Sequence, residues 1–110
     1  MLPNIPGLGQ LQKQMQKMQE DMNALQVALD NERLENSFGG GAVKVVTNGK
    51  GEVMEIVLSP EIVDPSDIEM LQDLVVSAVR EALKKAEDHK TVKMNEVTGG
   101  VLGKLPPGLF

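Results

Sequence analysis

Hydrophobic residues recur at alternating steps of three and four along the first quarter of the chain. This spacing puts them on one side of an α-helix, and the intervening residues are good helix formers, so the pattern predicts a helix over residues 8–29. At 1.5 Å per residue the helix would be about 33 Å long. That is long for a chain of 110 residues, so we expect part of it to project and its apolar side to need a covering helix, from this chain or from a second subunit. The apolar seam consists of Leu8, Leu11, Met15, Met18, Met22, Leu25 and Leu29.

Short runs rich in β-branched residues, separated by glycines, follow over residues 32–58. A weak strand is expected over 32–38, and the glycines at 39–41 predict a turn. The runs AVKVVT at 42–47 and EVMEIVL at 52–58 predict two strands. The sequence NGKG at 48–51 would supply the positive φ angles of a tight hairpin between them. Both faces of this small antiparallel sheet carry apolar side chains, so we expect helices or a second subunit to cover it.

A second helix is predicted over residues 65–97. Its start signal is Asp64 as the cap, Pro65 in the first turn and Asp67 three residues after the cap. The helical spacing of apolar residues fades over 87–91, which predicts a bend followed by a short last helical piece. Thr98 and the two glycines after it would end the ordered domain. Together the elements predict a single α+β domain with about three strands between two long helices.

The two ends of the chain are expected to be flexible, over residues 1–7 and 98–110. The last ten residues, VLGKLPPGLF, are rich in glycine and proline but also apolar. A second interpretation is a docking strip, in which Leu105, Leu109 and Phe110 join dimers into larger assemblies.

The residues that carry catalytic or metal chemistry are scarce. Cysteine is absent, and His89 is the one histidine, which we expect to be a solvated residue near a helix end. No serine lies in a nucleophile elbow, and no glycine-lysine pair has the spacing of a phosphate-binding loop. Glu69 and Asp73 are explained by the positive end of the helix dipole. The sequence therefore predicts no enzyme, no cofactor, no metal and no small-molecule substrate. It also has no long apolar run and no secretory signal, which favours a cytoplasmic protein with no membrane partner.

The charge of the chain is −5, but the basic residues are concentrated. Lys13 and Lys17 are the only charged residues in the first nineteen, and they lie on the side of the helix away from the seam. In the second helix the basic residues also suit an ordinary solvated face, where Glu81 and Lys85 form a favourable pair. If they bind nucleic acid, aromatic residues are too few for base stacking, and the contact would be to duplex backbone. The candidate DNA-binding residues are Gln10, Lys13, Lys17, Arg80, Lys84, Lys85, Lys90 and Lys93.

Three stretches of the sequence resemble one family along nearly the whole chain. They are the run KQMQKMQEDM, the run from GGGAVKVVTNGKGEV through DPSDIEMLQDL to ALKKAED, and TGG with a PGLF end. In this order and spacing they resemble the YbaB/EbfC nucleoid-associated proteins. The resemblance implies a homodimeric DNA-binding protein of the bacterial cytoplasm and nucleoid, shaped like tweezers. A shared β core would carry protruding helices that hold duplex DNA and alter its conformation. The matching pieces are the first helix, with Lys13 and Lys17, and the helical end after Arg80. An alternative function is a protein-binding helical scaffold with no direct DNA contact.

Overall fold

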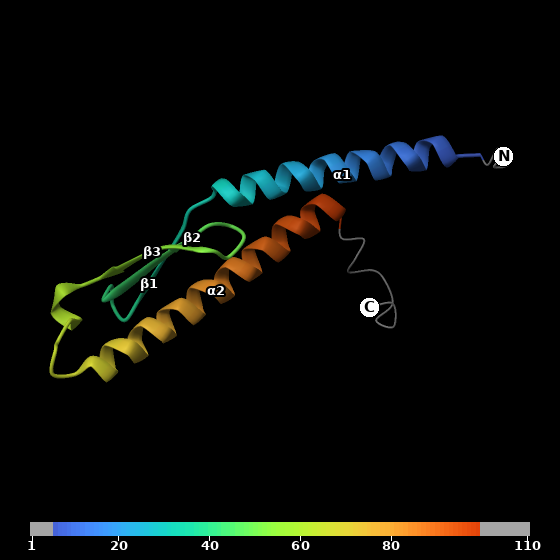
Figure 1. Cartoon of the computed structure of the whole chain (residues 1–110). Coiled ribbons are helices and arrows are strands. Elements are labelled where there is room, and N and C mark those ends of the chain that lie inside the picture. Colours follow the sequence, from blue (N-terminus) through green and yellow to red (C-terminus); the bar gives the residue numbers. More distant parts are fainter. Residues whose placement is uncertain (1–5, 100–110) are drawn as a thin grey trace, which may run out of the picture.

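Two long helices and a three-stranded antiparallel sheet make up the molecule, which confirms the predicted α+β fold (Figure 1). The computed structural model describes residues 6–99. Helix α1 spans Leu8–Asn31 and helix α2 spans Ile68–Thr98, with a short 3₁₀ turn at Pro60–Ile62 before α2. The strands between the helices are β1 (Leu34–Phe38), β2 (Val43–Thr47) and β3 (Val53–Leu58). The parts of the predicted segments at 1–5 and 100–110, including Leu105, Leu109 and Phe110, lie outside the described residues.

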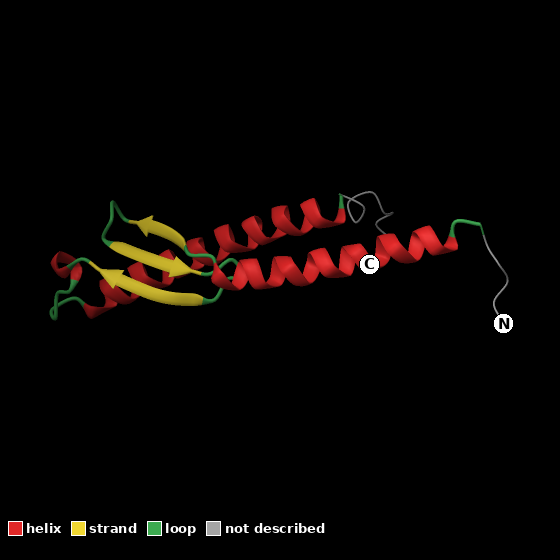
Figure 2. Cartoon of the chain, turned by 90° about the horizontal axis from the view of Figure 1, so that it is seen from above, coloured by secondary structure: helices red, strands yellow, loops and turns green. Residues whose placement is uncertain are grey.

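The apolar seam of α1 is covered only along the carboxyl-terminal half of the helix. Leu29 is fully buried, whereas Leu11 is 52% exposed and Met15 64% exposed. The reason is visible in two views: α2 runs beside the end of α1 nearest the sheet, and α1 continues past the end of α2 (Figures 1 and 2). Helix α2 of the same chain therefore covers the inner half of the seam, which is the half nearest the sheet. The sequence did not determine whether this chain or a second subunit would supply the covering helix.

The sheet has the order β1-β2-β3, so β2 lies in the centre and the other two strands form its edges. The glycines at 39–41 all have positive φ, from 64° to 93°, which confirms the predicted turn between β1 and β2. The hairpin between β2 and β3 differs in detail from the prediction. Of its two glycines only Gly51 has a positive φ, at 90°, and the register is irregular at Val46 and Thr47.

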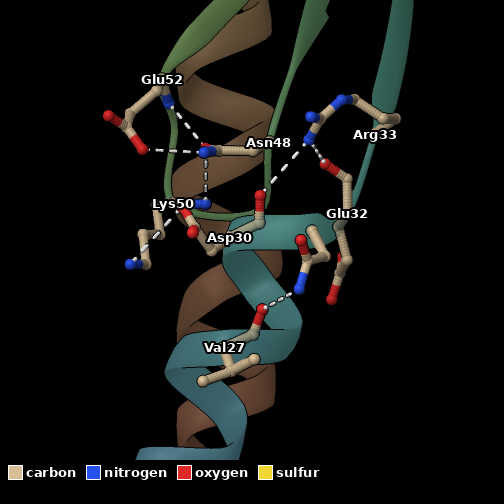
Figure 3. Close-up of polar contacts among 8 residues, drawn as sticks. Val27, Asp30, Glu32, Arg33, Asn48, Lys50 and Glu52 are labelled. Atoms are coloured by element: carbon tan, nitrogen blue, oxygen red, sulfur yellow. Dashed lines mark hydrogen bonds and ion pairs between the residues drawn. The ribbon is translucent and has the colours of Figure 1, made fainter.

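Asn48 organises the β2–β3 hairpin through its side chain (Figure 3). Its Oδ1 accepts hydrogen bonds from the backbone N–H groups of Lys50 and Glu52, both at 3.0 Å, and its Nδ2 donates to Glu52 Oε1 at 2.8 Å. An asparagine that bonds to its own turn is a common substitute for a backbone turn. Asn48 is only 2% exposed, so these bonds satisfy a buried amide.

Helix α2 packs its small residues against the sheet. Ala78 and Ala82 are buried against Val43 and Val45 of the central strand, and Phe38, Leu58, Ile62, Leu74 and Val79 pack around this core. Alanines allow the helix to approach the strands closely, so a core without Trp or Tyr can still close. The α2 helix contacts mainly β1 and β2, which leaves β3 less covered.

The start of α2 corrects the sequence prediction by three residues. The cap is Asp67, whose Oδ1 accepts a hydrogen bond from the backbone N–H of Met70 at 3.1 Å. Asp64 instead accepts hydrogen bonds from the Ser66 hydroxyl at 2.7 Å and the Ser66 backbone N–H at 2.9 Å. These bonds, the hydroxyl first, hold the pKa of the Asp64 carboxyl below its usual value. Two capping residues three positions apart gave the sequence two possible starts, and the helix uses the second.

The predicted bend at 87–91 is wrong, because α2 runs unbroken to Thr98 and ends at Gly99 with a φ of 64°. His89 is also not a solvated helix-end residue. Its Nε2 lies 2.5 Å from Glu32 Oε2, with about 28% of its side chain exposed, and the contact joins α2 to the segment after α1. Packing against α1 and the contact between His89 and Glu32 stabilise this part of α2. The helix therefore continues although the apolar pattern in the sequence fades.

Candidate nucleic-acid interface

The outer half of α1 presents a polar side to solvent. Gln10, Lys13 and Lys17 are all exposed, on the side of the helix away from the seam. Lys17 Nζ lies 3.6 Å from Asp21 Oδ2, with the side chains 76% and 47% exposed. Such an exposed pair contributes little free energy, so the Lys17 ammonium can still bind another anion. Lys13 forms no ion pair with any residue in the range 6–99.

Arg80 and Lys84 form a second exposed group, on α2. They lie one turn apart on the side of the helix opposite the buried alanines. Neither makes an ion pair within the described part of the chain. Their charges therefore face solvent over the body of the molecule.

The other three candidate residues of α2 lie closer to the rest of the chain. Lys85 Nζ donates to Asn36 Oδ1 of β1 at 2.7 Å and lies 3.2 Å from Glu81, which confirms the predicted Glu81–Lys85 pair. Lys90 and Lys93 are partly buried, and Lys93 lies 3.7 Å from Glu96. Lys85 is exposed but held near β1 by its bond to Asn36, and the partly buried Lys90 and Lys93 have less freedom to reach a phosphate than Arg80 and Lys84.

One chain does not bring the two exposed groups together. Arg80 lies 18 residues before the end of α2, which is about 27 Å along the helix axis. Lys13 lies in the second turn of α1, and the amino-terminal part of α1 continues past that end of α2 (Figures 1 and 2). The two groups are therefore separate surfaces within one chain.

The described residues offer little else that resembles a chemical site. Residues 6–99 contain no cluster of three or more histidine or acidic side chains that could hold a metal ion. Neither helix in this range has a stretch long and apolar enough to cross a bilayer.

The structure reveals two surface features, of which the sequence had indicated only that the sheet is apolar on both faces. The edge strand β3 is exposed on both faces, with Val53, Met54, Ile56 and Val57 between 40% and 49% exposed. A groove of about 470 Å³ also lies between Phe38 and the first turns of α2. The run EVMEIVL carried a signal for the first feature, because it is apolar on both faces. The groove had none, because Phe38 and α2 are about thirty residues apart in the sequence.

Comparison with known proteins places this elongated α+β chain in a class of DNA-binding proteins. The chain is a member of the YbaB/EbfC DNA-binding family, whose model matches residues 5–101. A nucleoid-associated protein from Ruminiclostridium cellulolyticum is 52% identical over 103 residues, covering 94% of this chain and 88% of the relative. One from Acetivibrio thermocellus is 50% identical over 109 residues, covering 96% of this chain and 95% of the relative.

A solved structure supports the fold independently. The crystal structure of an uncharacterized protein from Helicobacter pylori matches with a TM-score of 0.67 at 24% identity, covering 82% of this chain and 96% of that one. The family model that matches residues 5–101 confirms the family predicted from the three sequence stretches.

Proposed function

We propose that the protein binds the backbone of duplex DNA as a homodimer, alters the conformation of the DNA, and acts in nucleoid organisation and gene regulation in the bacterial cytoplasm. The observation that carries the proposal is the exposed pair Lys13 and Lys17 on an arm of α1 that extends clear of the body, in a member of a DNA-binding family. Ammonium groups on a projecting helix can approach phosphates without a clash from the rest of the protein.

The net charge of −5 does not oppose this proposal. At about 0.1 M salt the electrostatic screening length is roughly 10 Å, which is shorter than the arm. The described arm from residue 6 to residue 19 holds two lysines and no acid, and the acids nearest to them are Glu20 and Asp21. Half of the sixteen acidic residues lie between Glu35 and Asp73, from the sheet to the start of α2, where their effect on the arm is screened.

A homodimer would double these contacts and fix the distance between two arms. Strand β3 supports a self-complementary contact, because it is an edge strand with exposed apolar side chains and unpaired backbone groups along one side. Two copies that pair through β3 would bury this surface and leave both arms exposed.

A salt titration of duplex DNA binding tests the proposal. For the double variant Lys13→Ala with Lys17→Ala we expect weaker binding to all sequences alike. The slope of log affinity against log salt should flatten by about 0.9 for each phosphate that the variant no longer neutralises. The matched control is Lys44→Ala with Lys50→Ala, which removes the same charge from the sheet region, where both lysines are paired with acids. Equal affinities for the arm variant and the wild type would refute the arm as the site. The variant Arg80→Ala with Lys84→Ala would then test the second exposed group.

A protein-binding helical scaffold is the second candidate function. The observation that favours it is the uncovered outer half of the seam, where Met15, Met18, Gln19 and Met22 line a groove of about 260 Å³. Methionine-rich grooves accept partner helices of varied shape. Binding of a partner protein that is insensitive to salt, without any shift of DNA, would favour this function over the first.

A further inference from the structure

The groove beside Phe38 is lined by residues of the first turns of α2, whereas Gly99, where the described chain ends, follows the last turn. The two ends of α2 lie far apart (Figure 1). The floor of the groove is apolar, formed by Phe38 at the end of β1 together with Met70 and Leu74 of α2. Its rim is acidic. The acidic residues that line it are Asp67, Glu69 and Asp73.

None of these acids is neutralised within residues 6–99. No ion pair in that range involves any of the three, although the Asp67 carboxylate caps α2. The groove therefore suits an apolar segment that carries a positive charge.

We propose that this groove binds the segment 101–110 of a second copy of the chain. The segment, VLGKLPPGLF, is apolar, and Lys104 is its one charged residue. Leu105, Leu109 and Phe110 would fill the apolar floor, and Lys104 would lie against the acidic rim. Pro106 and Pro107 favour an extended segment of the kind that docks against aromatic side chains, and Phe38 is the one aromatic residue among those described.

The groove of the same chain is out of reach of Lys104. Asp73 lies 25 residues before Thr98, which is about 38 Å along the axis of α2. Lys104 follows Thr98 by six residues, and six residues span at most about 22 Å when fully extended. The contact is therefore between chains.

An assembly built this way has a defined geometry. The groove and the segment are different parts of the chain, so the contact is heterologous and repeats from copy to copy. It also leaves β3 free, because the groove borders β1 at the other edge of the sheet. Dimers paired through β3 would be linked into larger assemblies by a short segment of modest affinity that acts several times at once.

Sedimentation velocity of the full chain over a range of concentrations, without DNA, tests the proposal. We expect assemblies larger than the smallest species for the wild type, and a shift toward that species for Lys104→Glu and for Asp73→Lys. Asp73 is chosen because it lies beyond the first turn of α2 and does not cap it. The matched control is Glu87→Lys, the reversal of an exposed acid on the same helix far from the groove, which should leave the distribution unchanged. Circular dichroism would confirm that each variant folds.

Two complementation measurements make the test sharper. The chain with both Lys104→Glu and Asp73→Lys restores opposite charges and should recover the larger assemblies. An equimolar mixture of the two single variants should recover them as well, because each groove then meets a complementary segment from the other variant. Size distributions that are identical for the wild type and both single variants would overturn the proposal. The double variant Leu109→Ser with Phe110→Ser gives a second possible contrary result. If its assemblies kept the size of the wild type while hydrogen exchange in residues 11–18 became faster, the segment would lie on the arm and the proposal would be wrong. No readout involves DNA, so failure here would leave the proposed DNA binding untouched.

Discussion

Gly49 lies where the β2–β3 hairpin touches the end of α1. Its backbone N–H donates to Leu29 O at 2.8 Å. A Cβ at this position would lie 2.7 Å from Leu29 Cδ2 and 3.0 Å from Leu29 Cα. The glycine is required because the helix passes too close for a side chain, and not because of a left-handed backbone.

The variant Gly49→Ala should therefore destabilise the fold by about 1–3 kcal/mol, the usual cost of forcing extra atoms into a packed contact. The measurement is the free energy of unfolding in urea. Gly9→Ala is the control, because Gly9 lies in α1 with nothing within 4 Å of its added Cβ. That change should be neutral or stabilising, since alanine favours helix over glycine by up to about 1 kcal/mol. Similar stability for Gly49→Ala and the wild type would contradict the close approach.

At the scale of elements, the residue that caps the amino-terminal end of α2 differs from the one that the sequence suggested. The sequence offered Asp64, Pro65 and Asp67 as one start signal. In the structure Asp67 caps the helix, and Asp64 forms a separate turn with Ser66. The two aspartates are therefore expected to contribute differently to helix stability.

Replacing Asp67 with alanine should cost about 1 kcal/mol of stability, because the backbone N–H of Met70 loses its acceptor. Replacing Asp64 with alanine should cost less, since it removes a turn that is fully exposed. Chemical denaturation of both variants, compared with the wild type, measures the difference. A larger loss for Asp64→Ala would return the cap to the position that the sequence suggested.

The second element-scale result concerns α1, whose seam is continuous in sequence but divided in space. Its inner half packs against α2, and its outer half is exposed. The inner half of α1 therefore stabilises the fold, and the outer half is free to bind partners. Lys13 and Lys17 lie on the outer half.

At the scale of the whole molecule, the proposed dimer depends on β3. Ile56 is 40% exposed on this strand, and a lysine on an edge strand opposes pairing with another edge. Ile56→Lys should therefore reduce the mass measured by sedimentation equilibrium toward that of one chain. Val27→Lys is the control, because Val27 is 63% exposed on the outer side of α1. If Ile56→Lys keeps the mass of the wild type, the dimer uses another surface.

The sequence alone determined the type and order of the elements and the family. Helical spacing predicted α1 closely, and the glycines at 39–41 and 99 marked a turn and a helix end, because these signals depend on local backbone geometry. It also singled out Lys13 and Lys17, since charge and helical position can both be read along the chain.

Only the tertiary structure decided which surfaces are covered. It showed that α2 buries half of the seam, that His89 contacts Glu32, that Gly49 meets Leu29, and that a groove forms beside Phe38. Each of these features joins residues distant in sequence. Local periodicity fixes which side of an element is apolar, but burial depends on which other element lies against that side, and that is a property of the folded chain.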